Sequence, residues 1–201
     1  NPAQSLWDWE GWPDLVAQVT RNLSGLPWAA EFCRGPTGID FVPMQLHTPL
    51  LMLNLDLFKR LGLPEPPFIA TWAEFEALAR EFVAKGNAGR PRRDVFFCEG
   101  LGLPLLLHTS GLSLLNETGT SLASLDEPRK AVMARLLRWI YDEHILPTAA
   151  ELSAANVDNL GYSASFAMLS SGKLAANFTG RFIAIFMRQL PPAKRVNMGA
   201  M

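Results

Sequence analysis

Apolar side chains recur every three or four residues in several segments of the chain, the spacing that the buried face of a helix produces. The clearest segment follows Thr71, which forms a capping-box pattern with Glu74. Its apolar stripe continues until Gly86, a typical end signal. The pattern therefore predicts a helix over residues 72–86.

A second long helix is expected after Asp126, which is a favourable N-cap. Pro128 falls in its first turn, where the missing N–H costs nothing. His144 falls in the expected last turn, and Pro147 ends the helix. The side chains expected along its apolar face are Val132, Met133, Leu136, Leu137 and Ile140. Shorter helices are expected around 15–23, over 55–61 after an Asn54 cap, within 100–111, over 163–171 and from 180 to about 190.

Continuous apolar runs separate these helices and predict strands. Such runs occupy 95–97, 174–178 and 196–201. Residues 39–53 also have extended character. Pro43 and Pro49 would interrupt a central strand, so we expect a strand, a break and a second strand there. Strands that alternate with helices are typical of an α/β fold.

Length and composition are those of an ordinary globular protein. The chain has 201 residues, 49% hydrophobic and 18% charged, which fits one or two domains with a packed core. A net charge of -1, with no basic run before 194–195, argues against a nucleic-acid partner. The first residues lack a signal-peptide pattern, and the longest apolar run, 49–53, is too short to span a membrane. Because the sequence stops inside the predicted strand 196–201, we expect it to be part of a longer folding unit.

Cysteine and histidine do not predict a metal site. Cys33 and Cys98 lack metal-ligand spacing, and the three histidines, His47, His108 and His144, are scattered. The cysteines can be two buried thiols or one long-range disulfide, and their spacing does not decide between these. We therefore expect neither a metal nor a cofactor.

Six segments occur in an order that resembles a known family. They are GIDFVP at 38–43, LLMLNLDLFKRLGLPEPP at 50–67, TWAEFEALAREF at 71–82, GLSLLNETGTSLASLDEPRKAVMARLLRWIYDEHILP at 111–147, FAMLSSGKLAANFTGRF at 166–182 and RVNMGAM at 195–201. The ordered set resembles sugar-binding family 1 of the extracellular solute-binding proteins, the maltodextrin-binding-protein-like components of ABC importers. No single segment is specific, and the order and spacing of all six carry the resemblance.

The resemblance implies an α/β, two-lobe periplasmic-binding-protein type II fold, present here in part because the family's chains are roughly twice as long. Residues 1–45 would be the end of the N-terminal lobe, 46–195 the C-terminal lobe and 196–201 the returning hinge strand. The lobes would close on a sugar, oligosaccharide, polyol or sugar phosphate and deliver it to the importer's membrane permease subunits. Such binding proteins are not enzymes. They are periplasmic or extracellular, and some are anchored to the membrane by a lipid.

The resemblance places candidate ligand contacts near the hinge. Gln45, His47 and Thr48 form a polar group inside an otherwise apolar run. A neutral imidazole can donate a hydrogen bond to a sugar hydroxyl and also accept one. The alternative for His47 is a side chain packed at a strand end.

A second group of candidates follows the predicted strand 174–178. Phe182 matches the family's stacking tryptophan, and core burial is its alternative. In the preceding Thr179-Gly180-Arg181, the glycine permits close approach of the backbone, and the guanidinium could bind an acidic ligand with two parallel bonds. A solvated surface position is the alternative for Arg181. Glu99 follows the strand at 95–97, where the family has cleft residues, and its alternative is a solvated loop acid.

Enzymatic alternatives have weak support in the sequence. The acidic pairs 126–127 and 142–143 lie at expected helix ends, and no Gly-x-Ser-x-Gly motif occurs. The segment 170–173 lacks the earlier glycine and the following hydroxyl residue of a phosphate loop. Two alternatives to a transport function remain, a sensor ectodomain on the same fold and a glycan-active α/β enzyme domain.

Overall fold

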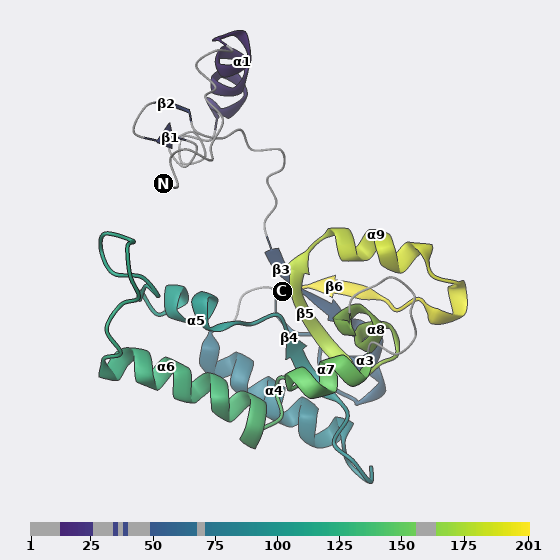
Figure 1. Ribbon diagram of the computed structural model, residues 1–201. Helices are drawn as coiled ribbons and strands as arrows, with labels where there is room; N and C mark the ends of the chain where they lie inside the picture. The colour runs from purple at the N-terminus through teal and green to yellow at the C-terminus, as the bar shows by residue number, and fades with distance from the viewer. Residues whose placement is uncertain (1–12, 26–33, 36–37, 40–48, 68–70, 156–163) are drawn as a thin grey trace. The chain divides into compact units, whose positions relative to one another are not determined.

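The computed structural model describes residues 13–25, 34–35, 38–39, 49–67, 71–155 and 164–201 (Figure 1). The chain divides into two compact units, Asn1–His47 and Thr48–Met201. In the first unit, the structure describes helix α1 (Pro13–Leu23), whose Val19 is buried. It also describes an antiparallel pair of two-residue strands, β1 (Arg34–Gly35) and β2 (Gly38–Ile39). The helix predicted around 15–23 is confirmed.

A four-stranded sheet forms the centre of the second unit. Its strands are β3 (Pro49–Asn54), β4 (Phe96–Glu99), β5 (Leu174–Gly180) and β6 (Met198–Ala200), in the order β4-β5-β3-β6. Strands β4 and β5 run parallel, whereas β3 is antiparallel to both β5 and β6. Strand β3 is therefore hydrogen-bonded along both of its edges. Because β4 and β5 are parallel, their carboxyl ends lie at the same end of the sheet.

Helices cover both faces of this sheet, with α4 and α6 on one face and α8 and α9 on the other (Figure 1). The helices are α3 (Leu55–Arg60), α4 (Trp72–Gly86), α5 (Leu103–Thr109), α6 (Glu127–Leu137), α7 (Ala149–Ala155), α8 (Ala164–Ser170) and α9 (Phe182–Gln189). A 3₁₀ turn, Pro192–Lys194, precedes β6. The α/β organisation predicted from alternating strands and helices is confirmed.

Each face of the sheet has its own apolar core. On the α4 side, aromatic rings pack against one another with centroids 5.1–6.3 Å apart. These rings belong to Phe58, Phe75, Phe82, Phe97 and Trp139. The core on the α8 side is mostly aliphatic and is built from Met52, Phe96, Phe166, Met168, Leu169, Leu174, Ile183, Met187 and Leu190.

Local capping signals place the helix starts as predicted. The Thr71 hydroxyl accepts from the Glu74 N–H, and the Glu74 carboxylate accepts from the Thr71 N–H, which completes the capping box of α4. The Asn54 side chain accepts from the Leu57 N–H and begins α3 directly after β3.

The helix after Asp126 differs from its prediction. It begins as expected, but α6 passes into a π-helical turn, Arg138–Asp142, in which the Glu143 N–H donates to the Arg138 carbonyl. Leu137, expected on the apolar face, is 52% exposed, whereas Trp139, seven residues after the buried Val132 and therefore on the same helical face, is fully buried. His144 lies beyond the helix with a φ of +53° and is not in its last turn.

Helix α7 was not predicted and follows a second capping box, between Thr148 and Glu151. Cys98 is a free, fully buried thiol, as one of the two alternatives for the cysteines had it, and Cys33 lies outside the described residues. No helix in the described part of the chain has the length and apolar character needed to cross a membrane.

Candidate functional site

Five of the predicted ligand contacts lie at the end of the sheet where β4 and β5 finish. We call this the carboxyl end, made of residues 99–100 and 177–182, and we call the opposite end the amino end. Glu99, Thr179 and Gly180 are the final residues of β4 and β5, and Arg181 and Phe182 follow them. In α/β sheets, ligands bind outside the carboxyl ends of parallel strands. The other three candidates, Gln45, His47 and Thr48, lie outside the described residues.

The Glu99 side chain is held by a residue that the sequence did not single out as a ligand contact. Asn177 is the register partner of Glu99 in the parallel pair β4–β5, so the two side chains lie on the same face. The Asn177 Nδ2 donates to Glu99 Oε2 over 2.5 Å. A carboxylate can only accept, so this bond also fixes which way the amide faces. Glu99 is half-buried and is not the solvated loop acid considered as its alternative.

Gly100 fixes the path of the chain directly after Glu99. Its φ of +92° is unfavourable for residues with a side chain. A Cβ atom there would also lie 2.6 Å from the Phe178 carbonyl oxygen. The backbone therefore leaves β4 in close contact with β5, and this position requires glycine.

Cys98 contributes structure rather than reactivity. Burial raises the pKa of its thiol well above the ordinary value, and the nearby Glu99 charge raises it further. Its Sγ–H donates to the Glu99 carbonyl over 3.4 Å. The thiol therefore stays protonated and inert at neutral pH.

The residues after β5 form the exposed part of this end. Strand β5 continues through Gly180, so the helix predicted from residue 180 begins at Phe182, with Arg181 at the N-cap position. Arg181 is exposed, and no carboxylate in the described part of the chain pairs with its guanidinium. Phe182 is 42% exposed and is not a core side chain. Its ring lies edge-on to Phe186 with centroids 5.7 Å apart, which supports the ring from one side.

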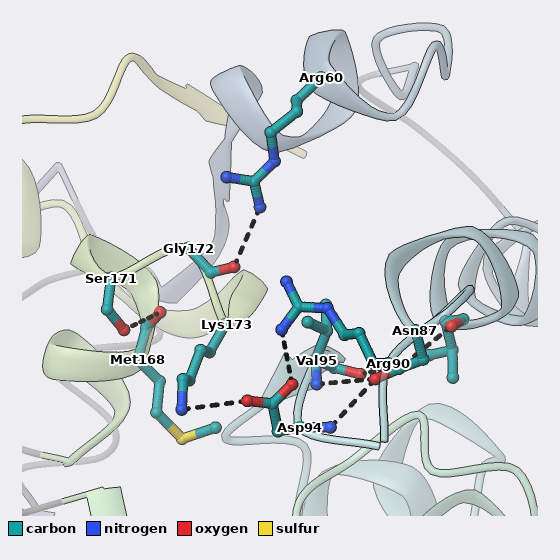
Figure 2. A network of polar contacts seen from close by, with 10 residues as sticks. Arg60, Asn87, Arg90, Asp94, Val95, Met168, Ser171, Gly172 and Lys173 are labelled. Carbon is teal, nitrogen blue, oxygen red and sulfur yellow. Dashed lines mark hydrogen bonds and ion pairs between the residues drawn. The ribbon is translucent and has the colours of Figure 1, made fainter. Parts of the chain in front are cut away.

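The amino end of the sheet also gathers polar side chains, but these bond to one another (Figure 2). The Asp94 carboxylate accepts from Arg90 over 2.7 Å and pairs with Lys173 over 3.1 Å. Burial alone would raise the pKa of Asp94, but the bonds from Lys173 and Arg90 outweigh it and hold the pKa below its ordinary value. The Arg60 guanidinium donates to the Gly172 carbonyl over 3.4 Å.

A groove of about 390 Å³ lies beside this network. It is lined by Arg92, Arg93, Asp94, Phe96, Glu151, Ala154, Ala155, Met168 and Lys173. Both acids on its wall are already engaged, Asp94 with Arg90 and Lys173, and Glu151 with the Thr148 cap. Arg92 and Arg93 are exposed and have no orienting bond among the described residues, so the groove offers no oriented acceptor, and we favour the carboxyl end as the binding site.

The described residues contain no group of three metal-ligating side chains. The arrangement at the carboxyl end instead combines a fixed acceptor, a close-approach glycine, an exposed guanidinium and a half-exposed aromatic ring. These groups are suited to holding a polar ligand that also has an apolar face.

Solved structures share the fold of this chain, although no family model and no curated protein matches its sequence. The periplasmic solute-binding protein ECA2210 from Pectobacterium atrosepticum aligns with a TM-score of 0.68 and 15% identity, over 97% of this chain and 46% of that chain. The ABC substrate-binding protein Lmo0181 from Listeria monocytogenes, in complex with cycloalternan, aligns with a TM-score of 0.66 and 16% identity. The alignment covers 98% of this chain and 47% of that chain. Maltose-bound MalE3 of T. maritima aligns with a TM-score of 0.59 and 17% identity, and the alignment covers 98% of this chain and 47% of that chain.

These alignments show that the chain has the α/β fold of the periplasmic binding proteins, in part. The chain spans about half the length of these structures, 46–47% of each.

Proposed function

We propose that the chain is part of the extracytoplasmic solute-binding component of an ABC importer, and that it binds a carbohydrate or a related solute at the carboxyl end of its sheet. The observation that carries this proposal is that an exposed aromatic ring, Phe182, and an oriented carboxylate, Glu99, both belong to that end. Phe182 keeps 42% of its surface exposed, and Glu99 is oriented by Asn177. A sugar ring offers an apolar face to an aromatic ring and hydroxyl donors to a carboxylate.

The structural relatives support a carbohydrate as the solute class. Besides the complexes with cycloalternan and maltose, they include a sugar transporter from Arthrobacter chlorophenolicus with bound laminaribiose and CpMnBP1 with mannobiose. These sugars are ligands of the other proteins. For this chain they are the first compounds to test for binding.

Three parts of the proposal follow from the same fold. The importer's permease subunits would receive the solute, and the protein would act in the periplasm or outside the cell, with or without a lipid anchor. Gln45, His47 and Thr48 would contribute polar contacts from the hinge side of the site. Closure around the ligand requires no covalent chemistry, so the proposed protein is a carrier and not an enzyme.

Glu99 and Arg181 favour different solutes. A carboxylate bonds to donors such as hydroxyl groups, whereas an exposed guanidinium favours a carboxylate or phosphate. The test panel should therefore contain an acidic sugar beside the neutral ones.

Titration calorimetry on the full-length protein, with maltose, mannobiose, laminaribiose and glucuronic acid, tests this function. Saturable binding of at least one sugar, recovered unchanged by chromatography after prolonged incubation, is the expected result. Hydrolysis of any of these sugars would favour the enzyme alternative, and no binding to any of them would contradict the carbohydrate proposal.

A further inference from the structure

Two polar side chains are buried in the described part of the second unit. Asn54 is 1% exposed and Asn177 is 5% exposed. A buried amide is unfavourable unless its polar atoms are hydrogen-bonded, so each position requires a physical explanation.

The fold explains Asn54. Its Oδ1 accepts from the Leu57 N–H over 3.2 Å and caps α3. Its Nδ2 donates to the Leu169 carbonyl over 2.9 Å, which satisfies the last turn of α8. Both polar atoms of this amide therefore serve backbone groups that would otherwise be buried without partners.

The fold does not explain Asn177 in the same way. The one side-chain bond that the described residues give it runs to Glu99, another side chain. Its partner across β3 is Met52, which is buried and apolar. A leucine has nearly the same shape, and replacing a bonded polar pair by apolar groups is often neutral or stabilising. The reason for the amide must therefore be sought in Glu99.

Glu99 is fixed at several points but keeps one oxygen available. The ladder of β4 and the strained Gly100 hold its backbone, and the Asn177 amide holds Oε2. A carboxylate has acceptor positions on both oxygens, and no donor among the described residues bonds to Oε1. The result is a preoriented acceptor at the carboxyl end of the sheet.

We propose that Asn177 is a positioning residue, which holds one oxygen of Glu99 so that the other is presented to a hydrogen-bond donor of the ligand. This inference rests on the proposed function and narrows it. The ligand offers a hydroxyl or ammonium group to Glu99, and an acceptor-only group such as a carboxylate or phosphate is excluded from this position. Bonds between a neutral donor and an ionised acceptor are stronger than neutral ones, so loss of this orientation weakens binding measurably.

The first experiment needs no ligand. NMR three-bond couplings of the Glu99 side chain in the full-length protein should report one dominant rotamer. Asn177→Leu should change this to averaging between rotamers, and Asn177→Asp, which keeps the shape but places a like charge beside Glu99, should do the same. Ser171→Ala, at an exposed position of the opposite end of the sheet, is the control and should leave the Glu99 couplings unchanged. An unchanged single Glu99 rotamer in both Asn177 variants would overturn the proposal.

The second experiment is a double-mutant cycle, with whichever of maltose, mannobiose and laminaribiose binds the wild type. Asn177→Leu should lower affinity about tenfold in the wild type, but less than about twofold when Glu99 is already alanine. Equal losses in both backgrounds would show that Asn177 acts independently of Glu99. If none of the three sugars binds, the proposed function fails, and the rotamer experiment still decides the positioning role.

The ligand class has its own measurement. Glu99→Gln replaces one acceptor oxygen by a donor, so it should reduce the preference for glucosamine over glucuronic acid at least about fivefold. If Glu99→Gln keeps the wild-type preference for glucosamine over glucuronic acid, the claim that the ligand must offer a hydrogen-bond donor to Glu99 is wrong.

Discussion

The two ends of the central sheet use polar side chains in opposite ways. At the amino end, Asn54, Asp94 and Lys173 bond to backbone carbonyls or to one another, so their hydrogen-bonding capacity is used within the protein. At the carboxyl end, Oε1 of Glu99 accepts no hydrogen bond from the described residues, and Phe182 is 42% exposed. The comparison teaches that the number of polar groups does not identify a binding site. A better sign of a binding site is a polar group that the protein orients while some of its hydrogen-bonding positions remain unused.

The largest effect in this comparison is expected from Asn54→Ala. The change removes the cap of α3 and leaves the buried Leu169 carbonyl without its donor. We expect the free energy of unfolding to fall by about 3 kcal/mol, as measured by urea denaturation. Sugar affinity, measured well below the unfolding transition, should stay within twofold. Ser171→Ala, at an exposed position of the same end, is the control and should cost less than about 0.5 kcal/mol.

Gly100→Ala should affect both stability and binding. The substitution strains a backbone with a φ of +92° and forces a Cβ atom against the Phe178 carbonyl. We expect a stability loss of about 2 kcal/mol, together with weaker sugar binding, because the turn after Glu99 must move. Gly119→Ala is a matched control, with a φ of +67° and no atom within 4 Å of the added Cβ. It should cost only about 1 kcal/mol and leave affinity unchanged, and equal effects of the two variants would refute the importance of the close approach.

Phe182→Ala should separate binding from stability. The ring is 42% exposed, so its removal should cost less than about 1 kcal/mol of stability. Loss of stacking on a sugar should weaken affinity about tenfold, or ~1.4 kcal/mol. Ile185→Ala, a 58% exposed position on the same helix, should change neither quantity appreciably. Unchanged affinity in Phe182→Ala would place the ligand away from α9.

The smallest effect concerns acid stability at the amino end. Because the folded state lowers the pKa of Asp94, its ionised form stabilises the protein above the ordinary pKa, and this contribution disappears as pH falls through the folded value. Asp94 is 38% exposed, so solvent screening limits the contribution to about 0.5 kcal/mol. Asp94→Asn should therefore destabilise slightly at pH 7 and match the wild type once the pH is below the lowered pKa of Asp94. Urea midpoints measured from neutral pH into acid give the difference between the two proteins.

Local signals in the sequence predicted the parts of the fold that local contacts determine. The Thr71–Glu74 box and the Asn54 cap involve residues three apart, and both are present as expected. The capping box at Thr148 and Glu151 carried the same signal for α7 and was overlooked. The π-helical turn Arg138–Asp142, by contrast, is not anticipated by a regular helical period.

The candidate site was predictable only where a resemblance supplied the positions. That resemblance indicated Glu99, Thr179, Gly180, Arg181 and Phe182. The Asn177–Glu99 bond joins residues 78 positions apart on neighbouring strands, and only the parallel register brings them together. One signal was present in the sequence, since Asn177 is a polar residue inside a buried apolar strand.

The position of β3 between β5 and β6 has a consequence for how the chain is made. Of the four strands of this sheet, β3 is synthesised first, and the two strands that bond to it, β5 and β6, are synthesised last. The roughly 120 residues that separate it from β5 take on the order of 10 s to synthesise. Throughout that interval, the apolar segment Pro49–Asn54 has neither of its final hydrogen-bonding neighbours. A nascent chain stalled after α6 would therefore present two unpaired edges of an apolar strand, and we expect ribosome-released fragments of that length to aggregate rather than fold.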